Sequence, residues 1–425
     1  MKTTANASTQ TSENTTRPTN HGTGLVCLFL IGSVFIGTTA FYLNVPIPDG
    51  LQNPWQYRLL TGGKRVVSDM AAFQELAFGR PYPISLRNTV EMLTFPSPSE
   101  VEGSNILCSI TAIAGVKVHL YEPIERKTHD GPALIFLHGG GFFFGSSDMW
   151  DSLIRRIAEE LDILVVSLQT AFDDCYAVTK WILENAVGFG IDRTRVGISG
   201  DSAGGTLAAA VAQYIHDDNT LPDLKYQALI YPVSQLLDIE TPAQQKYRRH
   251  FGENGGMITW WEAAALVSWY VLGKSDEEVI TTFMENTQTP SQFWQEGVQA
   301  KFVNHTLVPE EFTMDGYYSP LPTNREGNVK LWSDIGSTLL DPRLCPLMRL
   351  NMSNLPPAFV ATCEFDAMRD NGIYYVKRLE QDDVAVVWKH YEGGFHGVFG
   401  PSWPFTFKIG EQMFADYIQF IKSHW

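Results

Sequence analysis

Apolar segments of strand length alternate with amphipathic segments of helix length through residues 105–235 and again through residues 345–425. The expected strands are NILCSITAI, VKVHLYEP, ALIFLHGGG, DILVVSL, TRVGISG, YQALIYPV, PPAFVATCEFD and VAVVWKHY. Strands that are apolar along their whole length need cover on both faces, and the helices between them supply it. We therefore predict an α/β fold in which these two segments form a mostly parallel central sheet flanked by helices.

The alternation stops in residues 236–344, which are rich in large aromatic side chains. These include Trp260, Trp261, Trp269, Tyr270, Phe283, Phe293 and Trp294. Ligands of open α/β sheets bind at the carboxyl ends of the strands, so an insertion at that edge can cover a binding site. We interpret residues 236–344 as a helical cap, to which residues 45–104 add a further segment. The alternative is an ordinary helical subdomain whose aromatic side chains form a core of their own.

The first 44 residues divide into two regions of different composition. Residues 1–22 are rich in Thr, Ser and Asn and poor in apolar residues, so we expect a disordered tail. Residues 24–43, within the segment 23–44, carry no charge over about 20 residues, the length that crosses a bilayer core. We predict a transmembrane signal anchor that contacts the lipid bilayer. The alternative is a cleaved signal peptide, whose N-terminal region is usually shorter than this tail.

The charges before the apolar segment favour one orientation of the anchor. Lys2 and Arg17 precede it, so we expect the tail in the cytoplasm and the rest of the chain across the membrane. Glycosylation sequons occur at Asn6, Asn14, Asn304 and Asn351. In this orientation only Asn304 and Asn351 are available for N-glycosylation, and both should lie on surface loops.

The composition argues against several classes of function. The formal net charge is −16 and no cluster of Lys and Arg occurs, so a nucleic-acid partner is not expected. No His-Glu-X-X-His motif or close cluster of His and carboxylate residues is present, so no metal site is predicted. We expect buried thiols from the widely spaced cysteines, although in an oxidising compartment the four after Cys27 could pair in three ways. The five are Cys27, Cys108, Cys175, Cys345 and Cys363.

A Gly-X-Ser-X-Gly motif lies between an expected strand and an alanine-rich helix. It runs from Gly200 through Asp201, Ser202 and Ala203 to Gly204. In a nucleophile elbow the serine occupies a strained turn at the end of a strand, and the two glycines let neighbouring backbone pass without a clash. We therefore interpret Ser202 as a nucleophile. The alternative is a small polar residue that only fits a tight turn.

A histidine followed by three glycines ends an earlier strand. These residues are His138, Gly139, Gly140 and Gly141. Glycines at this place allow backbone N–H groups to turn toward a developing oxyanion, together with the N–H after the nucleophile. We expect N–H groups of this glycine run and of Ala203 to donate these hydrogen bonds, the alternative being a flexible glycine turn. The run matches neither of the glycine patterns that bind nucleotide phosphates.

A serine nucleophile needs a base, and the base needs an orienting carboxylate. His396 lies in a glycine-flanked loop after a late strand and can reach back over the sheet, whereas His390 lies within a strand. Asp366 directly follows the strand AFVATCEF, and Asp370, one helical turn later, is expected to cap the next helix. We predict the catalytic set Ser202, Asp366 and His396, in the chain order of α/β-hydrolase triads.

With HGGG, GDSAGG, CEFDAMRDNG and GGFHG in this order, the chain resembles the hormone-sensitive-lipase-like carboxylesterases, and most closely their arylacetamide deacetylase group. The resemblance covers nearly everything from the apolar N-terminal segment onward. It implies an α/β-hydrolase fold with a helical cap, anchored in the endoplasmic reticulum membrane with the catalytic domain in the lumen. It also implies hydrolysis of hydrophobic carboxylic esters or aryl amides without a cofactor, by Ser202, Asp366 and His396 with oxyanion donors from Gly139, Gly140 and Ala203.

One segment departs from the family pattern. Between the VVS strand and the next helix, relatives carry a Tyr-Arg-Leu-Ala-Pro-Glu run, but here VVSLQTAFDDCYAV connects the two directly and about ten residues are missing. That loop would start beside the strand that carries the glycine run. Two hypotheses follow: a membrane-anchored serine hydrolase, or a folded but catalytically impaired or splice-shortened form that acts as a membrane-bound binding module.

Overall fold

The computed structural model describes residues 33–125, 130–168, 170–252, 255–313, 318–321, 323, 326–400 and 406–425. The chain forms two compact units, Met1–Asn44 and Val45–Trp425. In the first, residues 33–43 are helical. The predicted tail, Cys27 and the first part of the predicted anchor lie outside the described residues. Among the described helices, none is both long and apolar enough to cross a membrane.

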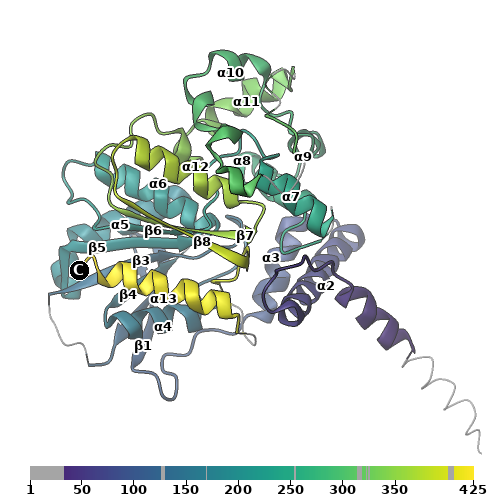
Figure 1. The fold of residues 1–425 in the computed structure, drawn as a ribbon. Helices are drawn as coiled ribbons and strands as arrows, with labels where there is room; N and C mark the ends of the chain where they lie inside the picture. The colour runs from purple at the N-terminus through teal and green to yellow at the C-terminus, as the bar shows by residue number, and fades with distance from the viewer. Residues whose placement is uncertain are drawn as a thin grey trace, which may run out of the picture. The chain divides into compact units, whose positions relative to one another are not determined.

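The second unit is built on a single eight-stranded sheet in the order β1-β2-β4-β3-β5-β6-β7-β8 (Figure 1). The strands are β1 (Ile106–Ile113), β2 (Val116–Pro123), β3 (Gly131–Leu137), β4 (Leu164–Leu168), β5 (Ile191–Asp201), β6 (Gln227–Ile230), β7 (Ala358–Phe365) and β8 (Val386–Phe395). The pairs β1–β2 and β2–β4 are antiparallel, and every other neighbouring pair is parallel. The predicted strands and the mostly parallel sheet are confirmed.

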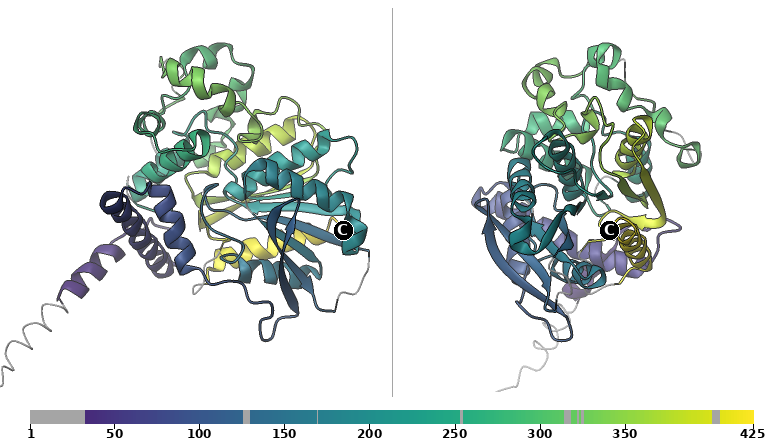
Figure 2. Two further views of the ribbon diagram at one scale, coloured as in Figure 1. Left: turned by 180° about the vertical axis from the view of Figure 1, so that it is seen from behind. Right: turned by 90° about the vertical axis from the view of Figure 1, so that its left-hand side faces the viewer.

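Helices cover both faces of this sheet (Figure 2). They are α4 (Asp151–Leu161), α5 (Phe172–Glu184), α6 (Ala203–Asp217), α12 (Arg369–Gln381) and α13 (Lys408–Lys422), with the short helix η1 (Ala186–Phe189). Apolar side chains of α5, α6 and α12 share one buried cluster with Ile135 and Leu137 of β3. Those of α4 and α13 share the other with Leu134 and Phe136. Successive β3 side chains therefore pack on opposite faces, which explains why the strand is apolar throughout.

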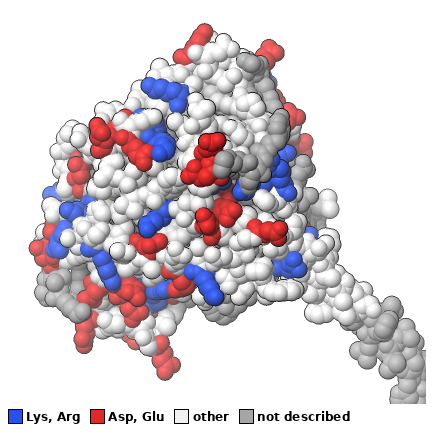
Figure 3. All heavy atoms as spheres, viewed as in Figure 1, with Lys and Arg blue, Asp and Glu red and all other residues white. Residues whose placement is uncertain are grey.

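Two further groups of helices gather on the side of the unit toward which the parallel strands point (Figure 1). The N-terminal group is α2 (Pro54–Phe78) and α3 (Tyr82–Leu93). The inserted group is α7 (Pro242–Phe251), α8 (Trp260–Leu272), α9 (Glu277–Met284), α10 (Ser291–Glu296), η2 (Val298–Phe302), η3 (His305–Leu307), η4 (Glu310–Phe312) and α11 (Val329–Leu339), after which η5 (Pro346–Met348) leads back to the sheet. On the face shown in Figure 3, basic and acidic side chains are interspersed.

The beginning of α12 differs from expectation. Met368, not Asp370, is the N-cap residue, and no side chain caps this helix. The Asp370 carboxylate instead accepts a hydrogen bond of 2.7 Å from the backbone N–H of Ala243 and pairs with the guanidinium of Arg369. The expected capping role was wrong because the buried carboxylate joins α12 to the first turn of α7, a contact between residues far apart in the chain.

Candidate active site

Ser202 occupies a sharp turn between β5 and α6. Its backbone has φ 56° and ψ −123°, a conformation in the positive-φ region that residues with a Cβ rarely adopt. A Cβ on Gly200 would lie 2.3 Å from the carbonyl oxygen of Gly204, and one on Gly204 would lie 1.9 Å from that of Leu137. The two glycines of the motif are therefore required sterically, as expected for an elbow that holds a strained serine.

Ser202, His396 and Asp366 meet at the carboxyl ends of three strands. The Oγ of Ser202 lies 2.8 Å from Nε2 of His396. Nδ1 of the same imidazole lies 3.0 Å from each carboxylate oxygen of Asp366. His396 follows β8 directly, Asp366 follows β7, and both side chains are buried. The structure thus brings together the three residues that the sequence selected from distant positions.

The environment of His396 favours its protonated form. Burial alone would lower the pKa of the imidazole, but the Asp366 carboxylate, and to a smaller extent Asp201, raise the pKa above its ordinary value of 6.5. The carboxylate also fixes the ring orientation, because Nδ1 must carry a hydrogen to donate to Asp366. Nε2 is then the atom free to accept a proton from the serine hydroxyl.

The glycine run lies beside the serine, but its hydrogen bonds differ from expectation. The N–H of Gly139 donates to Oδ1 of Asp201 at 2.8 Å. This contact contradicts the expected role of Gly139 as an oxyanion donor. Within the part of the chain that the structure describes, no hydrogen bond uses the N–H groups of Gly140, Gly141 or Ala203. Gly141, which sequence reasoning had treated only as part of the motif, therefore replaces Gly139 as a candidate donor.

Two neighbours hold the glycine run in place. The imidazole of His138 is stacked on Trp150 with ring centroids 4.7 Å apart, and burial lowers the pKa of His138 to about 4. The ring is therefore neutral near pH 7, and its Nδ1 donates to the carbonyl oxygen of Gly139 at 2.8 Å. Burial also raises the pKa of Asp201 to about 7, although the Gly139 N–H and His396 act in the opposite direction.

Two mostly apolar cavities extend from Ser202. The smaller, about 80 Å³, lies toward the inserted helices and is lined by Leu236, Trp260, Leu266 and Phe283 among others. The larger, about 420 Å³, lies toward α2 and α3 and is lined by Leu60, Val67, Leu86, Val90 and Phe144 among others. Residues 45–104 and 236–344 thus both line the space around the serine, and aromatic side chains of the insertion face that space as well as one another.

The competing histidine does not reach the serine. His390 lies within β8, and its Nδ1 contacts the hydroxyl of Thr362 at 3.0 Å. Burial lowers the pKa of His390 to about 4. It is therefore a neutral histidine of the sheet, in agreement with the structural role expected from its position in an alternating strand.

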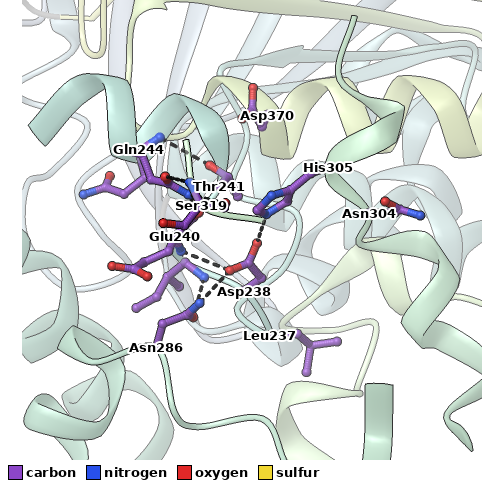
Figure 4. A network of polar contacts seen from close by, with 12 residues as sticks. Leu237, Asp238, Glu240, Thr241, Gln244, Asn286, Asn304, His305, Ser319 and Asp370 are labelled. Atoms are coloured by element: carbon purple, nitrogen blue, oxygen red, sulfur yellow. Dashed lines mark hydrogen bonds and ion pairs between the residues drawn. The ribbon is translucent and has the colours of Figure 1, made fainter. Parts of the chain in front are cut away.

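A second buried histidine–carboxylate pair lies in the insertion, and sequence reasoning missed it (Figure 4). Nε2 of His305 lies 2.8 Å from Oδ2 of Asp238, whose Oδ1 accepts 2.8 Å from Nδ2 of Asn286. Asp238 is fully buried, and no serine, threonine or cysteine side chain of the described residues forms a hydrogen bond with the imidazole. The pair joins the segment after β6 to the loop of η3. Nothing in the local sequence around either residue indicates this long-range contact.

A buried glutamate joins the N-terminal helices to the insertion. The Glu262 carboxylate on α8 pairs with Lys64 and accepts hydrogen bonds from Ser68 at 2.7 Å and from the hydroxyl of Tyr82 at 2.8 Å. Burial disfavours its ionisation, but Lys64, the Thr259 N–H and the Ser68 hydroxyl together lower the pKa of Glu262 to about 2. The sequence carried one signal, since Thr259 and Glu262 form a capping box at the start of α8.

The structure also describes four of the cysteines and the two predicted glycosylation sites. The four described cysteines, Cys108, Cys175, Cys345 and Cys363, are buried and unpaired by disulfides. Asn304 and Asn351 are both exposed and lie outside regular helices and strands, as predicted.

The family profile described as alpha/beta hydrolase fold matches residues 134–279 and 299–400, which include the turn at Ser202 and the loops of Asp366 and His396. The chain belongs to this family of α/β hydrolases. It is 33% identical to arylacetamide deacetylase of Bos taurus over 93% of this chain and 98% of the relative. It is 30% identical to neutral cholesterol ester hydrolase 1 of Bos taurus over 94% of this chain and 99% of the relative. The expected resemblance to the arylacetamide deacetylase group is confirmed.

Solved structures of two esterases share the fold at low sequence identity. A thermostable esterase from Pseudomonas putida has a TM-score of 0.56 at 20% identity, covering 89% of this chain and 98% of the esterase. A hyperthermophilic esterase from Pyrobaculum calidifontis has a TM-score of 0.55 at 22% identity, covering 88% of this chain and 98% of the esterase. The predicted α/β-hydrolase fold is therefore confirmed for the sheet and its flanking helices.

Proposed function

We propose that this α/β hydrolase is a membrane-anchored serine hydrolase that cleaves hydrophobic carboxylic esters or aryl amides. The observation that carries the proposal is the continuous contact from the Ser202 hydroxyl to Nε2 of His396 and from Nδ1 to the Asp366 carboxylate. A hydroxyl, an imidazole and a carboxylate in this order form the constellation that acyl transfer needs.

In the proposed mechanism Ser202 attacks the substrate carbonyl carbon while His396 accepts the hydroxyl proton. The N–H groups of Gly140, Gly141 and Ala203 stabilise the oxyanion that forms. His396 then returns the proton to the leaving alcohol or amine, which departs and leaves an acyl group on Ser202. Water, deprotonated by the same imidazole, hydrolyses this ester and restores the hydroxyl. Asp366 keeps the ring oriented and stabilises its positive charge in both steps.

The cavities beside Ser202 and the named relatives support one class of substrate. The linings on both sides of Ser202 are mostly apolar, which favours hydrophobic acyl and alcohol or amine groups. Relatives at 30% to 33% identity over most of the chain are named arylacetamide deacetylase and neutral cholesterol ester hydrolase. The two names span an aryl amide and a sterol ester, so we propose a hydrophobic ester or aryl amide as the substrate.

The proposed location is the endoplasmic reticulum membrane, with residues 24–43 as a single-pass anchor and the catalytic unit in the lumen. The uncharged run and the two preceding cations support this orientation. Exposure of Asn304 and Asn351 is compatible with N-glycosylation there.

The second hypothesis, a catalytically impaired binding module, rested on the short connection after β4. That strand ends at Leu168 and α5 begins at Phe172, so the connection is indeed short. The contact between Ser202 and His396 nevertheless measures 2.8 Å, within the range of an ordinary hydrogen bond. No observation of the described site therefore favours an inactive chain over a hydrolase.

The test compares the full chain with its Ser202→Ala variant. The unaltered chain should hydrolyse p-nitrophenyl acetate and react with a fluorophosphonate probe, and Ser202→Ala should do neither. Hydrolysis that survives in the variant would remove Ser202 from the nucleophile role. A folded wild-type chain that binds an ester analogue but neither turns over substrate nor reacts with the probe would favour the binding module.

A further inference from the structure

An apolar stripe runs along the outer surface of α2. Its members are Trp55, Leu59, Val66, Met70 and Phe73, with exposed fractions from 38% at Val66 to 68% at Trp55. At 3.6 residues per turn these five positions fall within an arc of about 60° on the helix. Isolated exposed apolar residues are ordinary, but five on one helix face, interrupted only by the buried Gly62, indicate a surface that is covered in function.

The face of α2 that adjoins the stripe borders the reaction site. Gly63, Lys64, Val67 and Ser68 line the larger cavity that reaches Ser202. Leu59 belongs to both surfaces, because it lines this cavity and is 44% exposed. The larger cavity and the apolar stripe therefore share the side chain of Leu59.

The helices α2 and α3 differ in net charge from the whole chain, although Lys64 pairs with the buried Glu262 and Arg87 pairs with Glu91. Residues 54–93 carry five basic and three acidic residues, a net charge of +2, whereas the chain as a whole carries −16. At one end of the stripe the guanidinium of Arg58 lies over the Trp55 ring, 5.1 Å from its centroid. Tryptophan beside a cation is typical of helices that lie in the headgroup region of a membrane.

The chain length supplies an independent argument for the occupant. Ten residues separate the apolar run 24–43 from Pro54 at the start of α2. An extended chain covers at most about 3.5 Å per residue, so this connection spans no more than about 35 Å. If residues 24–43 cross a bilayer, α2 is tethered close to the surface of that same bilayer.

We propose that the α2 stripe docks on the surface of the lipid bilayer and that apolar substrates pass from the lipid past Leu59 into the larger cavity. This inference rests on the proposed function, since it assigns a route to the substrate of Ser202. Trp55 and Phe73 insert among the lipid headgroups, and Arg58 beside Trp55 meets an anionic lipid phosphate. Esters dissolved in the membrane then reach the serine without crossing water.

Lipid contact is tested in the full-length chain reconstituted into vesicles of phosphatidylcholine and phosphatidylserine. Phe73→Cys and Val187→Cys, each in a Cys27→Ser background, carry a nitrobenzoxadiazole fluorophore. Val187 is a matched position because it is an exposed apolar residue on η1, in a different part of the unit. Nitroxide-bearing lipids should quench the label at residue 73 and leave the label at 187 unchanged. Equal emission from both labels would overturn the docking proposal, whether or not the enzyme is active.

Substrate entry is tested with Trp55→Ser combined with Phe73→Ser. Neither residue lines a cavity at Ser202, so hydrolysis of soluble p-nitrophenyl acetate should stay unchanged. Hydrolysis of p-nitrophenyl palmitate dissolved in the vesicles should fall about tenfold, because less apolar surface holds the helix on the lipid. The matched control, Val187→Ser with Leu350→Ser, should change neither rate. If the double variant hydrolysed p-nitrophenyl palmitate in vesicles at the wild-type rate, the proposed route would be contradicted. The same holds if its rates on the two esters fell by equal factors.

The outcomes separate this inference from its premise. A wild-type chain that does not hydrolyse the soluble ester contradicts the proposed function, and the fluorophore experiment still decides on docking. A second copy of the chain is the competing occupant of the stripe. If the Trp55 and Phe73 substitutions convert a detergent-solubilised dimer into a monomer, and the label at 73 is not quenched in vesicles, the stripe is a protein interface and the lipid proposal is wrong.

Discussion

The hydroxyl of Ser202 is an ordinary alcohol unless a neighbouring base can take its proton. Its reactivity therefore depends on which nitrogen of His396 faces it, and Asp366 decides this by binding the other nitrogen. The raised pKa of His396 has the same origin, since the carboxylate outweighs the effect of burial. Orientation and basicity of the imidazole thus follow from one buried contact.

Asp366→Asn should lower kcat by about four orders of magnitude with a small effect on folding, because an amide stabilises the wrong tautomer of His396. Steady-state kinetics on p-nitrophenyl acetate measure this loss. Asp238→Asn is the matched control, since it makes the same change at the other buried histidine–carboxylate pair. It should lower stability and leave kcat nearly unchanged. Similar kinetic losses in both variants would contradict the assignment of Asp366.

Asp201→Asn should move the acid limb of the pH profile of kcat/KM to lower pH. His396 acts as a base only when neutral, so activity rises with pH through its pKa, which lies above 6.5. Ionised Asp201 contributes to raising that pKa, and its own pKa is about 7. Removing its charge therefore lowers the pKa of His396. An acid limb that stays in place or moves to higher pH would show that Asp201 does not act on the imidazole electrostatically.

At the scale of secondary-structure elements, the strands and the elbow were predictable because each is encoded locally. Apolar runs, some continuous and some alternating with polar residues, predicted all eight strands, and the topological rule for parallel sheets predicted that Ser202, Asp366 and His396 emerge at one edge. The engaged N–H of Gly139 and the contact of Asp370 with α7 were not predictable. Both depend on partners 62 and 127 residues away, whose positions follow from tertiary packing.

Gly204→Ala should destabilise the fold by about 3 kcal/mol or more, because the new methyl group would lie 1.9 Å from the carbonyl oxygen of Leu137. Urea unfolding of the full chain in detergent measures the change. Gly63→Ala is the control, since a Cβ at this helical position of α2 has no atom within 4 Å. It should be neutral or stabilise by about 0.5 to 1 kcal/mol. Equal stability of both variants would contradict the close packing of the elbow against β3.

At the scale of the whole molecule, the space above Ser202 is enclosed by two segments that are far apart in sequence. Residues 45–104 contribute α2 and α3, and residues 236–344 contribute α7 and α8. Glu262 of α8 joins them through Lys64, Ser68 and Tyr82. The aromatic composition of residues 236–344 predicted a cap, to which residues 45–104 were assigned as a further segment. The connecting contact of Glu262 depends on tertiary packing and was not predictable from the sequence.

Glu262→Gln should remove a pH-dependent part of the stability. The pKa of Glu262 falls from 4.5 to about 2 on folding, so its contribution is present above 4.5 and is lost as pH decreases toward 2. Thermal unfolding of the wild type should therefore lose more stability between pH 6 and pH 3 than that of the variant. Parallel curves for the two proteins over this range would contradict the buried ionic contact.

The most direct measurement of the central claim is the site of covalent reaction in the wild-type chain. After treatment with a fluorophosphonate, peptide mass spectrometry should find one adduct, on Ser202, and prior incubation with a hydrophobic ester should slow its formation. An adduct at any other residue, or turnover of the ester by a chain in which Ser202 stays unmodified, would contradict the account.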